Sequence, residues 1–193
     1  MKRILTGAVA LGFTALASSS ASAQMANKSP IQFGVFGGVN FPVSDYQDLL
    51  KTGWNAGALL NFGFANSPVG LRIDGTWNQF NLKDFDGPHF RVLDATADAV
   101  FNFGATRIAK FYLIGGAGIY NFKITSNNDE DLSNSSPTKF GLNGGAGIKF
   151  NVGSLSPFVE ARYHYVFLNG NNFDNNGNNP KFQMIPISVG LTF

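Results

Sequence analysis

Apolar and polar residues alternate along eight segments of the sequence, as expected for β-strands with one apolar and one polar face. In the fourth segment, for example, Leu93 and Ala95 alternate with Asp94 and Thr96. The chain is therefore predicted to be all-β. The eight segments are residues 31–41, 53–64, 71–78, 93–103, 111–123, 141–151, 157–168 and 185–193.

The fifth segment is ambiguous, because apolar residues occupy both of its faces. A local repeat decides between them: residues 113–119 (Leu-Ile-Gly-Gly-Ala-Gly-Ile) resemble residues 142–148 (Leu-Asn-Gly-Gly-Ala-Gly-Ile), where one face is clearly polar. By analogy we expect Leu113, Ala117 and Ile119 to lie on the apolar face and to point outward.

The connections between the segments alternate in length. Residues 42–52, 83–90, 124–138 and 169–181 form longer connections than residues 65–68, 105–109 and 153–155. Short periplasmic turns and longer external loops are typical of outer-membrane barrels, whose tilted strands need about 9 to 11 residues to span. The spacing predicts an eight-stranded antiparallel up-and-down transmembrane β-barrel with both termini in the periplasm.

The composition supports a wall that faces lipid. Of the 193 residues, 44% are hydrophobic and only 13% are charged, with 20 Phe and no Cys. Soluble domains carry about a quarter charged residues, so a soluble sandwich with a Phe core would need a more charged surface. No stretch of 18 apolar residues follows residue 23, so a membrane-spanning chain has to close into a barrel. The absence of Cys excludes disulfides and thiolate metal sites.

The first 23 residues have the organisation of a secretory signal peptide. Lys2 and Arg3 precede an apolar run, and Ala21-Ser22-Ala23 forms a cleavage site. We expect residues 1–23 to be removed and residues 24–193 to form the barrel domain. Loss of the two basic residues leaves 12 basic and 12 acidic side chains, so nothing in the charge points to a nucleic-acid partner.

The final segment carries a resemblance to a known family. Residues 185–193 (Ile-Pro-Ile-Ser-Val-Gly-Leu-Thr-Phe) resemble the C-terminal assembly signal of bacterial outer-membrane proteins, with Val189, Leu191 and the terminal Phe193. Together with residues 111–122, 141–151 and 158–165, this segment resembles the OmpX/Ail family within the OmpA-like eight-stranded barrels. The resemblance implies outer-membrane lipids and the barrel-assembly machinery as partners. It leaves the activity open, because that family includes adhesins and stress-related proteins.

Pro186 conflicts with this assignment, because a closed barrel has no edge on which a missing backbone N–H is harmless. We expect either a β-bulge near residues 184–186 or a sheet ladder in which the hydrogen bond from residue 186 is missing.

Charged residues on the polar faces are predicted to meet in the lumen. An eight-stranded barrel is just wide enough for side chains to fill, so the favoured interpretation is a closed plug of ion pairs and hydrogen bonds. The predicted lumen network comprises Arg72, Asp74, Asp94, Asp98, Lys149, Glu160, Arg162 and His164.

Catalysis in the lumen is the sharper alternative, with His164 as a base and Glu160 as its orienting partner. No nucleophile accompanies them: residue 166 is Val, so the His-x-Ser arrangement of the lipid A deacylase PagL is absent. His89 falls in a predicted loop, and two isolated His residues lack metal-site spacing. We therefore expect no enzyme, and we assign no catalytic, cofactor or metal residues.

The predicted loops offer the remaining candidates for binding. Residues 127–131 concentrate three carboxylates that could hold a divalent cation, although a solvated acidic loop is favoured. Residues 169–179 are rich in Asn and Gly, which is typical of an exposed loop, and a partner could bind there. We expect a structural or adhesive role through the outer loops. A small pore or a conduit for apolar solutes is the first alternative, and a lipid-modifying enzyme is the second.

Overall fold

The computed structural model describes residues 31–83, 88–104, 106, 108–125, 137–168 and 181–193. The predicted signal peptide, residues 1–23, and the loop candidates 127–131 and 169–179 lie outside the described residues. No helix within the described ranges is long and apolar enough to cross a membrane.

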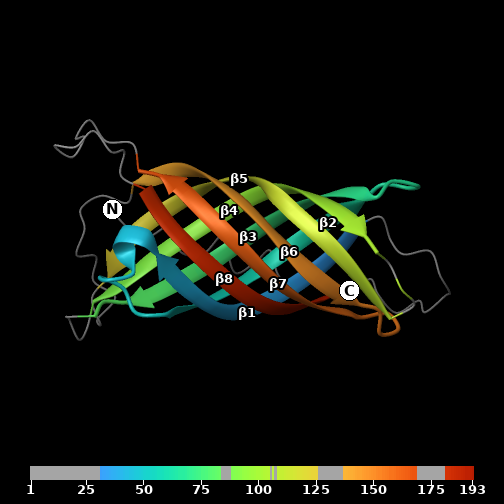
Figure 1. The fold of residues 1–193 in the computed structure, drawn as a ribbon, viewed down its shortest axis with the longest axis horizontal. Coiled ribbons are helices and arrows are strands. Elements are labelled where there is room, and N and C mark those ends of the chain that lie inside the picture. The colour runs from blue at the N-terminus through green and yellow to red at the C-terminus, as the bar shows by residue number, and fades with distance from the viewer. Residues whose placement is uncertain (1–30, 84–87, 105, 107, 126–136, 169–180) are drawn as a thin grey trace, which may run out of the picture.

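Eight antiparallel strands form a closed barrel, which confirms the predicted fold class (Figure 1). Each strand pairs with its neighbours in sequence, and the first pairs with the last over ten residue pairs, Gly34↔Thr192 to Val43↔Gln183. Closure leaves no unpaired sheet edge. The strands are β1 (Ile31–Val43), β2 (Gly53–Gly63), β3 (Val69–Asn81), β4 (His89–Phe103), β5 (Ala109–Thr125), β6 (Thr138–Phe150), β7 (Ser156–Phe167) and β8 (Lys181–Thr192).

The barrel has two different ends, visible at the left and right of Figure 1. One end carries the connections β2–β3, β4–β5 and β6–β7 together with the C-terminus, and we call it the short-turn end. The other carries the connections β1–β2, β3–β4, β5–β6 and β7–β8, and we call it the long-loop end. At the long-loop end, the β1–β2 connection forms the short helix η1 (Ser44–Tyr46), and Leu50 then forms an isolated bridge with Leu82.

Several strands extend further toward the long-loop end than the sequence predicts. The largest differences are in β4, which begins at His89, and in β8, which begins at Lys181. The placement of His89 in a loop is therefore wrong: it pairs with Asn81 and Thr125 in the sheet. The difference in polarity between the two faces becomes small at the strand ends, because neither face needs to be apolar where both contact water.

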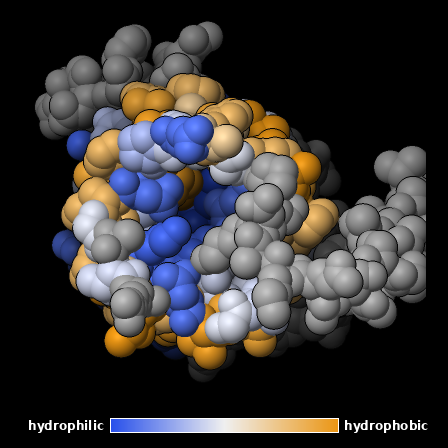
Figure 2. All heavy atoms as spheres, turned by 90° about the vertical axis from the view of Figure 1, so that its right-hand side faces the viewer, coloured by the Kyte–Doolittle hydropathy of each residue, from blue (hydrophilic) through white to orange (hydrophobic). Residues whose placement is uncertain are grey.

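Side chains alternate between the outer wall and the lumen as predicted. In β5, Leu113 and Ile119 are 49% and 56% exposed, whereas Tyr112 and Tyr120 are 3% and 0% exposed, so the face inferred from the repeat is confirmed. Figure 2, which looks into the short-turn end, shows hydrophobic residues around the outside and hydrophilic residues in the central hollow. This is the opposite of a soluble barrel, whose apolar face points inward.

Pro186 is accommodated by a skipped stretch of ladder rather than by a bulge. The β7–β8 pairs Ala161↔Ile187 and His164↔Met184 keep one register, but the two intervening pairs are absent. On its other side, Pro186 pairs with Asn40 in an unbroken β1–β8 ladder. An unchanged register means that no extra residue has been inserted, which excludes a bulge.

Candidate functional site

Two arginines and two acidic residues form a closed ring of ion pairs across the middle of the lumen. Arg72 and Asp74 come from β3, and Glu160 and Arg162 come from β7. Arg72 contacts Asp74 at 2.7 Å and Glu160 at 2.7 Å, and Arg162 contacts the same two carboxylates at 2.7 and 2.6 Å. Each guanidinium therefore bridges both carboxylates, so the ring connects opposite walls of the barrel.

Asp98 and several neutral donors extend this ring. Arg162 Nη1 lies 3.0 Å from Asp98, which also accepts hydrogen bonds from Asn143 (2.7 Å) and Thr96 (2.8 Å). The Tyr112 hydroxyl donates to Glu160 at 2.7 Å. Asp98 and Glu160 thus combine an arginine partner with neutral donors, and Asp74 contacts both arginines, so the desolvation cost of burying these carboxylates is offset.

Aromatic rings and a glycine shape the space around the ring of ion pairs. The Arg72 guanidinium lies 5.4 Å from the centre of the Phe158 ring and 5.9 Å from that of Phe36, which is within cation–π range. A Cβ at Gly116 would collide with the backbone of Ala97 and with the Asp98 carboxylate. Glycine at this position of β5 therefore makes room for Asp98.

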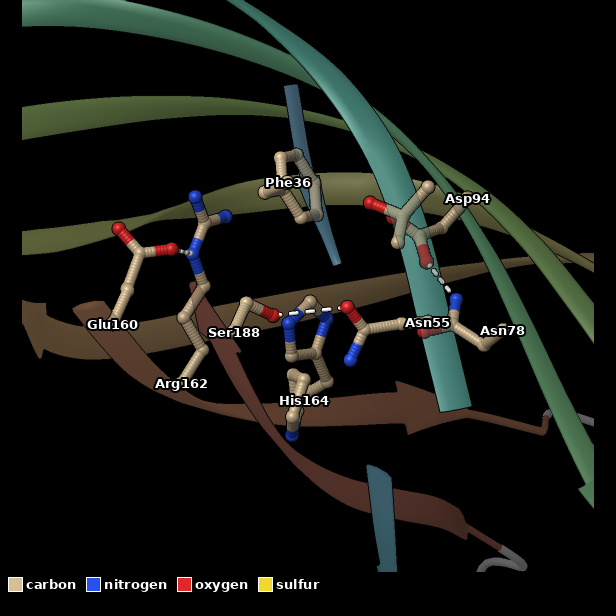
Figure 3. A pocket seen from close by; sticks show the side chains of 10 residues that line it. Phe36, Asn55, Asn78, Asp94, Glu160, Arg162, His164 and Ser188 are labelled. Carbon is tan, nitrogen blue, oxygen red and sulfur yellow. Dashed lines mark hydrogen bonds and ion pairs between the residues drawn. The ribbon is translucent and has the colours of Figure 1, made fainter. Parts of the chain in front are cut away.

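A second layer, made of amide side chains, lies next to the ion pairs (Figure 3). Asn78 donates to Asp94 at 2.6 Å and to the backbone of Val92, and it accepts from Asn40 at 2.6 Å. Ser188 and Asn55 continue this network at 2.9 Å. The structure thus places Asp94 among amides, whereas Asp74, Asp98 and Glu160 bind arginine.

His164 lies beside this layer with Tyr120 as its partner. The Tyr120 hydroxyl and His164 Nδ1 are 2.9 Å apart, and both side chains are buried. Glu160, the predicted orienting partner, is engaged by Arg72, Arg162 and Tyr112. The geometry therefore does not form the His–Glu pair that a catalytic interpretation needs. Among the described residues, no cluster of three His, Asp or Glu side chains is arranged to hold a metal ion.

An apolar layer fills the long-loop end of the lumen. The Phe182 ring lies at its centre, 5.1 to 6.1 Å from the rings of Tyr46, Phe80, Phe90 and Phe122. We call this layer the aromatic cluster. Its buried core also contains Leu50, Val92, Tyr120, Val166 and Met184. Sequence alternation did not predict this layer, although the inward positions of β3 and β5 end on Phe80 and Phe122. Phe182 and Met184 fell outside the predicted eighth segment.

Lys149 lies on the other side of the ion pairs, toward the short-turn end. Its Nζ is 3.4 Å from Gln32 Oε1, and it lines a cavity of about 620 Å³ that opens at this end. We call this cavity the vestibule. Of the predicted lumen set, Arg72, Asp74, Asp98, Glu160 and Arg162 are thus joined directly, whereas Asp94, His164 and Lys149 have other partners.

The residues of the predicted assembly signal lie at the short-turn end of β8. Val189 and Phe193 are 60% and 57% exposed on the outer wall, and Leu191 is half-buried. Backbone hydrogen bonds in both directions join Phe193 to Phe33 in β1, at 2.9 and 3.1 Å. The terminal residue therefore takes part in closing the barrel.

Comparison with known proteins agrees with this architecture. The crystal structure of Neisserial surface protein A is similar, with a TM-score of 0.61 and 14% identity over 85% of this chain and 96% of that one. The crystal structure of Ail, the attachment invasion locus protein of Yersinia pestis, aligns with a TM-score of 0.47 and 19% identity, covering 84% of this chain and 97% of that one. The crystal structure of the outer membrane enzyme PagL aligns with a TM-score of 0.49 and 18% identity, covering 84% of this chain and 98% of that one. At 14% identity, the likeness to Neisserial surface protein A shows the fold alone, and a fold does not determine an activity.

The sequence itself identifies the family. No curated protein matches the chain. The family model described as outer membrane protein beta-barrel domain matches residues 11–193, which is most of the sequence. The chain therefore belongs to the outer membrane protein beta-barrel domain family.

Proposed function

We propose that this outer-membrane barrel is closed to ions and acts as a structural or surface-interaction protein through its long-loop end. In this proposal the short-turn end and both termini face the periplasm, and the long loops face the exterior. The exposed apolar wall contacts outer-membrane lipids, and the C-terminal strand is recognised by the barrel-assembly machinery. Any catalytic function would then have to lie outside the lumen groups described above.

The observation that carries the proposal is the ring formed by Arg72, Asp74, Glu160 and Arg162. Its guanidinium and carboxylate groups meet at 2.6 to 2.7 Å across the centre of the lumen. The two cavities that border it measure about 20 Å³ each, which is the space of a single water molecule. An ion crossing this layer would have to separate paired charges in a confined space.

The other layers also support a closed barrel. The aromatic cluster lies in series with the ion pairs along the same axis, so a conducting path would have to pass both. A conduit for apolar solutes would need a lateral gap between strands instead. All eight neighbouring strand pairs are hydrogen-bonded, with the ladder interrupted only beside Pro186 among the described residues.

Planar-bilayer recording of the purified barrel tests the closed lumen. We expect no steady single-channel current in about 1 M salt, where surface charge is screened. Steady current from the unmodified protein would overturn the proposal in favour of a pore. Incubation with outer-membrane lipid followed by mass analysis tests the enzyme alternative, and a lipid product formed only with the barrel would establish it.

Epitope tags test the orientation and the surface role. A tag inserted in residues 169–180 should be accessible to antibody on intact cells, whereas a tag in the β6–β7 turn, residues 151–155, should require permeabilised cells. Deleting residues 170–179 should abolish any host-surface binding conferred by the barrel while leaving membrane insertion unchanged. The reverse accessibility of the two tags would contradict the proposed orientation.

A further inference from the structure

We propose that a small monovalent cation of the size of Na⁺ binds in the lumen between the carboxylate of Asp94 and the neutral oxygen atoms around it. Asp94 is 4% exposed, and its Oδ2 accepts a hydrogen bond from Asn78 at 2.6 Å. Its Oδ1 is buried but accepts no hydrogen bond. Burying an ionised carboxylate is costly unless a positive charge lies beside it. The inference concerns this inner site and does not depend on the surface role proposed above.

The arginines of the neighbouring layer do not supply this positive charge. Arg72 and Arg162 contact three other carboxylates at 2.6 to 3.0 Å, and no ion pair in the described part of the chain reaches Asp94. With these groups ionised, three carboxylates face two guanidinium groups, so the layer has no positive charge to spare. A cation beside Asp94 would therefore compensate a charge that the side chains leave uncompensated.

Oxygen atoms suited to a cation surround the free side of the carboxylate. A cavity of about 20 Å³ adjoins Asp94, and Thr76, Asn55 and Ser188 are among the residues that line it. Thr76 pairs directly with Asp94 in the β3–β4 ladder, and the Ser188 hydroxyl donates to Asn55 Oδ1 at 2.9 Å (Figure 3). Hydroxyl and amide oxygens carry two lone pairs each, so these hydrogen bonds leave some of them available. Carboxylate, amide and hydroxyl oxygens are the ligands that hard cations prefer.

The size and the charge of the cavity favour a monovalent ion. Its volume is about that of one water molecule, which suits a dehydrated ion as small as Na⁺ and excludes a bulky organic cation. One carboxylate supplies one negative charge. A divalent ion would therefore leave excess positive charge beside Arg162, which lines the same cavity. A water molecule would fill the space and donate to Oδ1, but it would leave the carboxylate without a counter-charge.

The test is refolding and urea unfolding of the mature barrel in phosphatidylcholine vesicles, in mixtures of sodium chloride and choline chloride at constant total concentration. The ion is supplied during refolding, because the ring of ion pairs and the aromatic cluster enclose the site. Choline keeps the ionic strength constant but is too large for the cavity. Since the ion binds only the folded barrel, the ratio of folded to unfolded protein should rise about tenfold for each tenfold increase in sodium above Kd.

Two substitutions on the same strand separate this site from a general effect of salt. Asp94→Asn keeps the shape of the side chain and removes its charge, so it should abolish the sodium dependence. Asp98→Asn is the matched control, because Asp98 is a buried carboxylate that binds Arg162 at 3.0 Å. It should keep the sodium dependence. Ser188→Ala removes one oxygen ligand and leaves the carboxylate, so it should shift the dependence to higher sodium concentrations.

The outcomes can overturn the site in three ways. Equal stability of the unmodified barrel in sodium chloride and in choline chloride would leave only a water molecule or a protonated carboxyl group at Asp94. Sodium dependence retained in full by Asp94→Asn would place the ion elsewhere, and its loss in Asp98→Asn would make it a property of the whole charged layer. A heat-induced gel shift shows whether each variant is folded. The comparison of the two salts for the unmodified barrel decides the proposal even if Asp94→Asn does not fold.

Discussion

Arg162→Ala is the most informative single substitution in this barrel. Arg162 is buried and contacts three carboxylates, with Nε 2.6 Å from Glu160, Nη2 2.7 Å from Asp74 and Nη1 3.0 Å from Asp98. Removing it leaves a group of acidic side chains with less positive charge and no water shell. The truncation therefore tests whether the ring of ion pairs stabilises the fold.

The size of the effect follows from what the three carboxylates retain. Asp74 and Glu160 keep Arg72, and Asp98 keeps its hydrogen bonds from Asn143 and Thr96. The loss is therefore smaller than the sum of three charge-assisted hydrogen bonds, each worth about 1.5 to 3 kcal/mol. Breaking a buried ion pair on one side costs about 3 to 5 kcal/mol, which is the expected decrease in the free energy of unfolding.

Urea unfolding in lipid vesicles, followed by tryptophan fluorescence, would measure this decrease. Arg91→Ala is the matched control, because Arg91 lies on the outer face with its guanidinium 4.6 Å from the centre of the Trp77 ring. That cation–π contact is worth about 0.5 to 1 kcal/mol at an exposed site. Arg162→Lys should fall between the two, since one ammonium cannot replace a guanidinium that reaches three carboxylates. A decrease for Arg162→Ala no larger than for Arg91→Ala, at an equal m value, would refute the reasoning.

Three further predictions address other parts of the chain. Phe182→Ala should lower the free energy of unfolding by about 3 to 5 kcal/mol, because the ring is fully buried in the aromatic cluster; an unchanged urea midpoint would contradict this packing. Phe193→Asp should reduce the fraction of protein inserted in the outer membrane, because Phe193 is an exposed outer-wall residue that closes β8 on β1; normal insertion would remove it from the assembly signal. Mass spectrometry of the membrane-bound protein should find Gln24 as the first residue, and an intact Met1 would contradict the predicted cleavage.

Alternation predicts the strands and their faces well, because a barrel between lipid and a polar lumen imposes opposite polarity on successive residues. The repeat shared by residues 113–119 and 142–148 was enough to orient β5, whose own residues are apolar on both sides. The same signal fails at the long-loop end, where Phe90 and Phe182 lie in strands but were predicted to lie in or near loops. Outside the membrane, outward positions no longer need to be apolar. The alternation of apolar and polar residues therefore ends before the strand itself ends.

The sequence predicts which charges face the lumen but not which of them pair. Arg72 and Glu160 are 88 positions apart on β3 and β7, and their contact depends on how far the strands are staggered around the barrel. The sequence spacing of His164 and Glu160 suggested a pair that the fold does not form. The shear and tilt of the strands determine which side chains meet across a closed barrel. No local sequence pattern encodes these two quantities.

If the barrel is closed as proposed, its two filled layers lie in series, and opening one of them should not open the barrel. Arg162→Ala would disrupt the ion pairs but leave the aromatic rings around Phe182 packed, and Phe182→Ala would leave the guanidinium–carboxylate ring intact. Each single variant should therefore remain non-conducting in planar bilayers, however much stability it loses. Only the double variant should pass current, provided that it still inserts. Current through Arg162→Ala alone would show that the ion pairs are the sole barrier, and current through Phe182→Ala alone would show the same for the aromatic cluster.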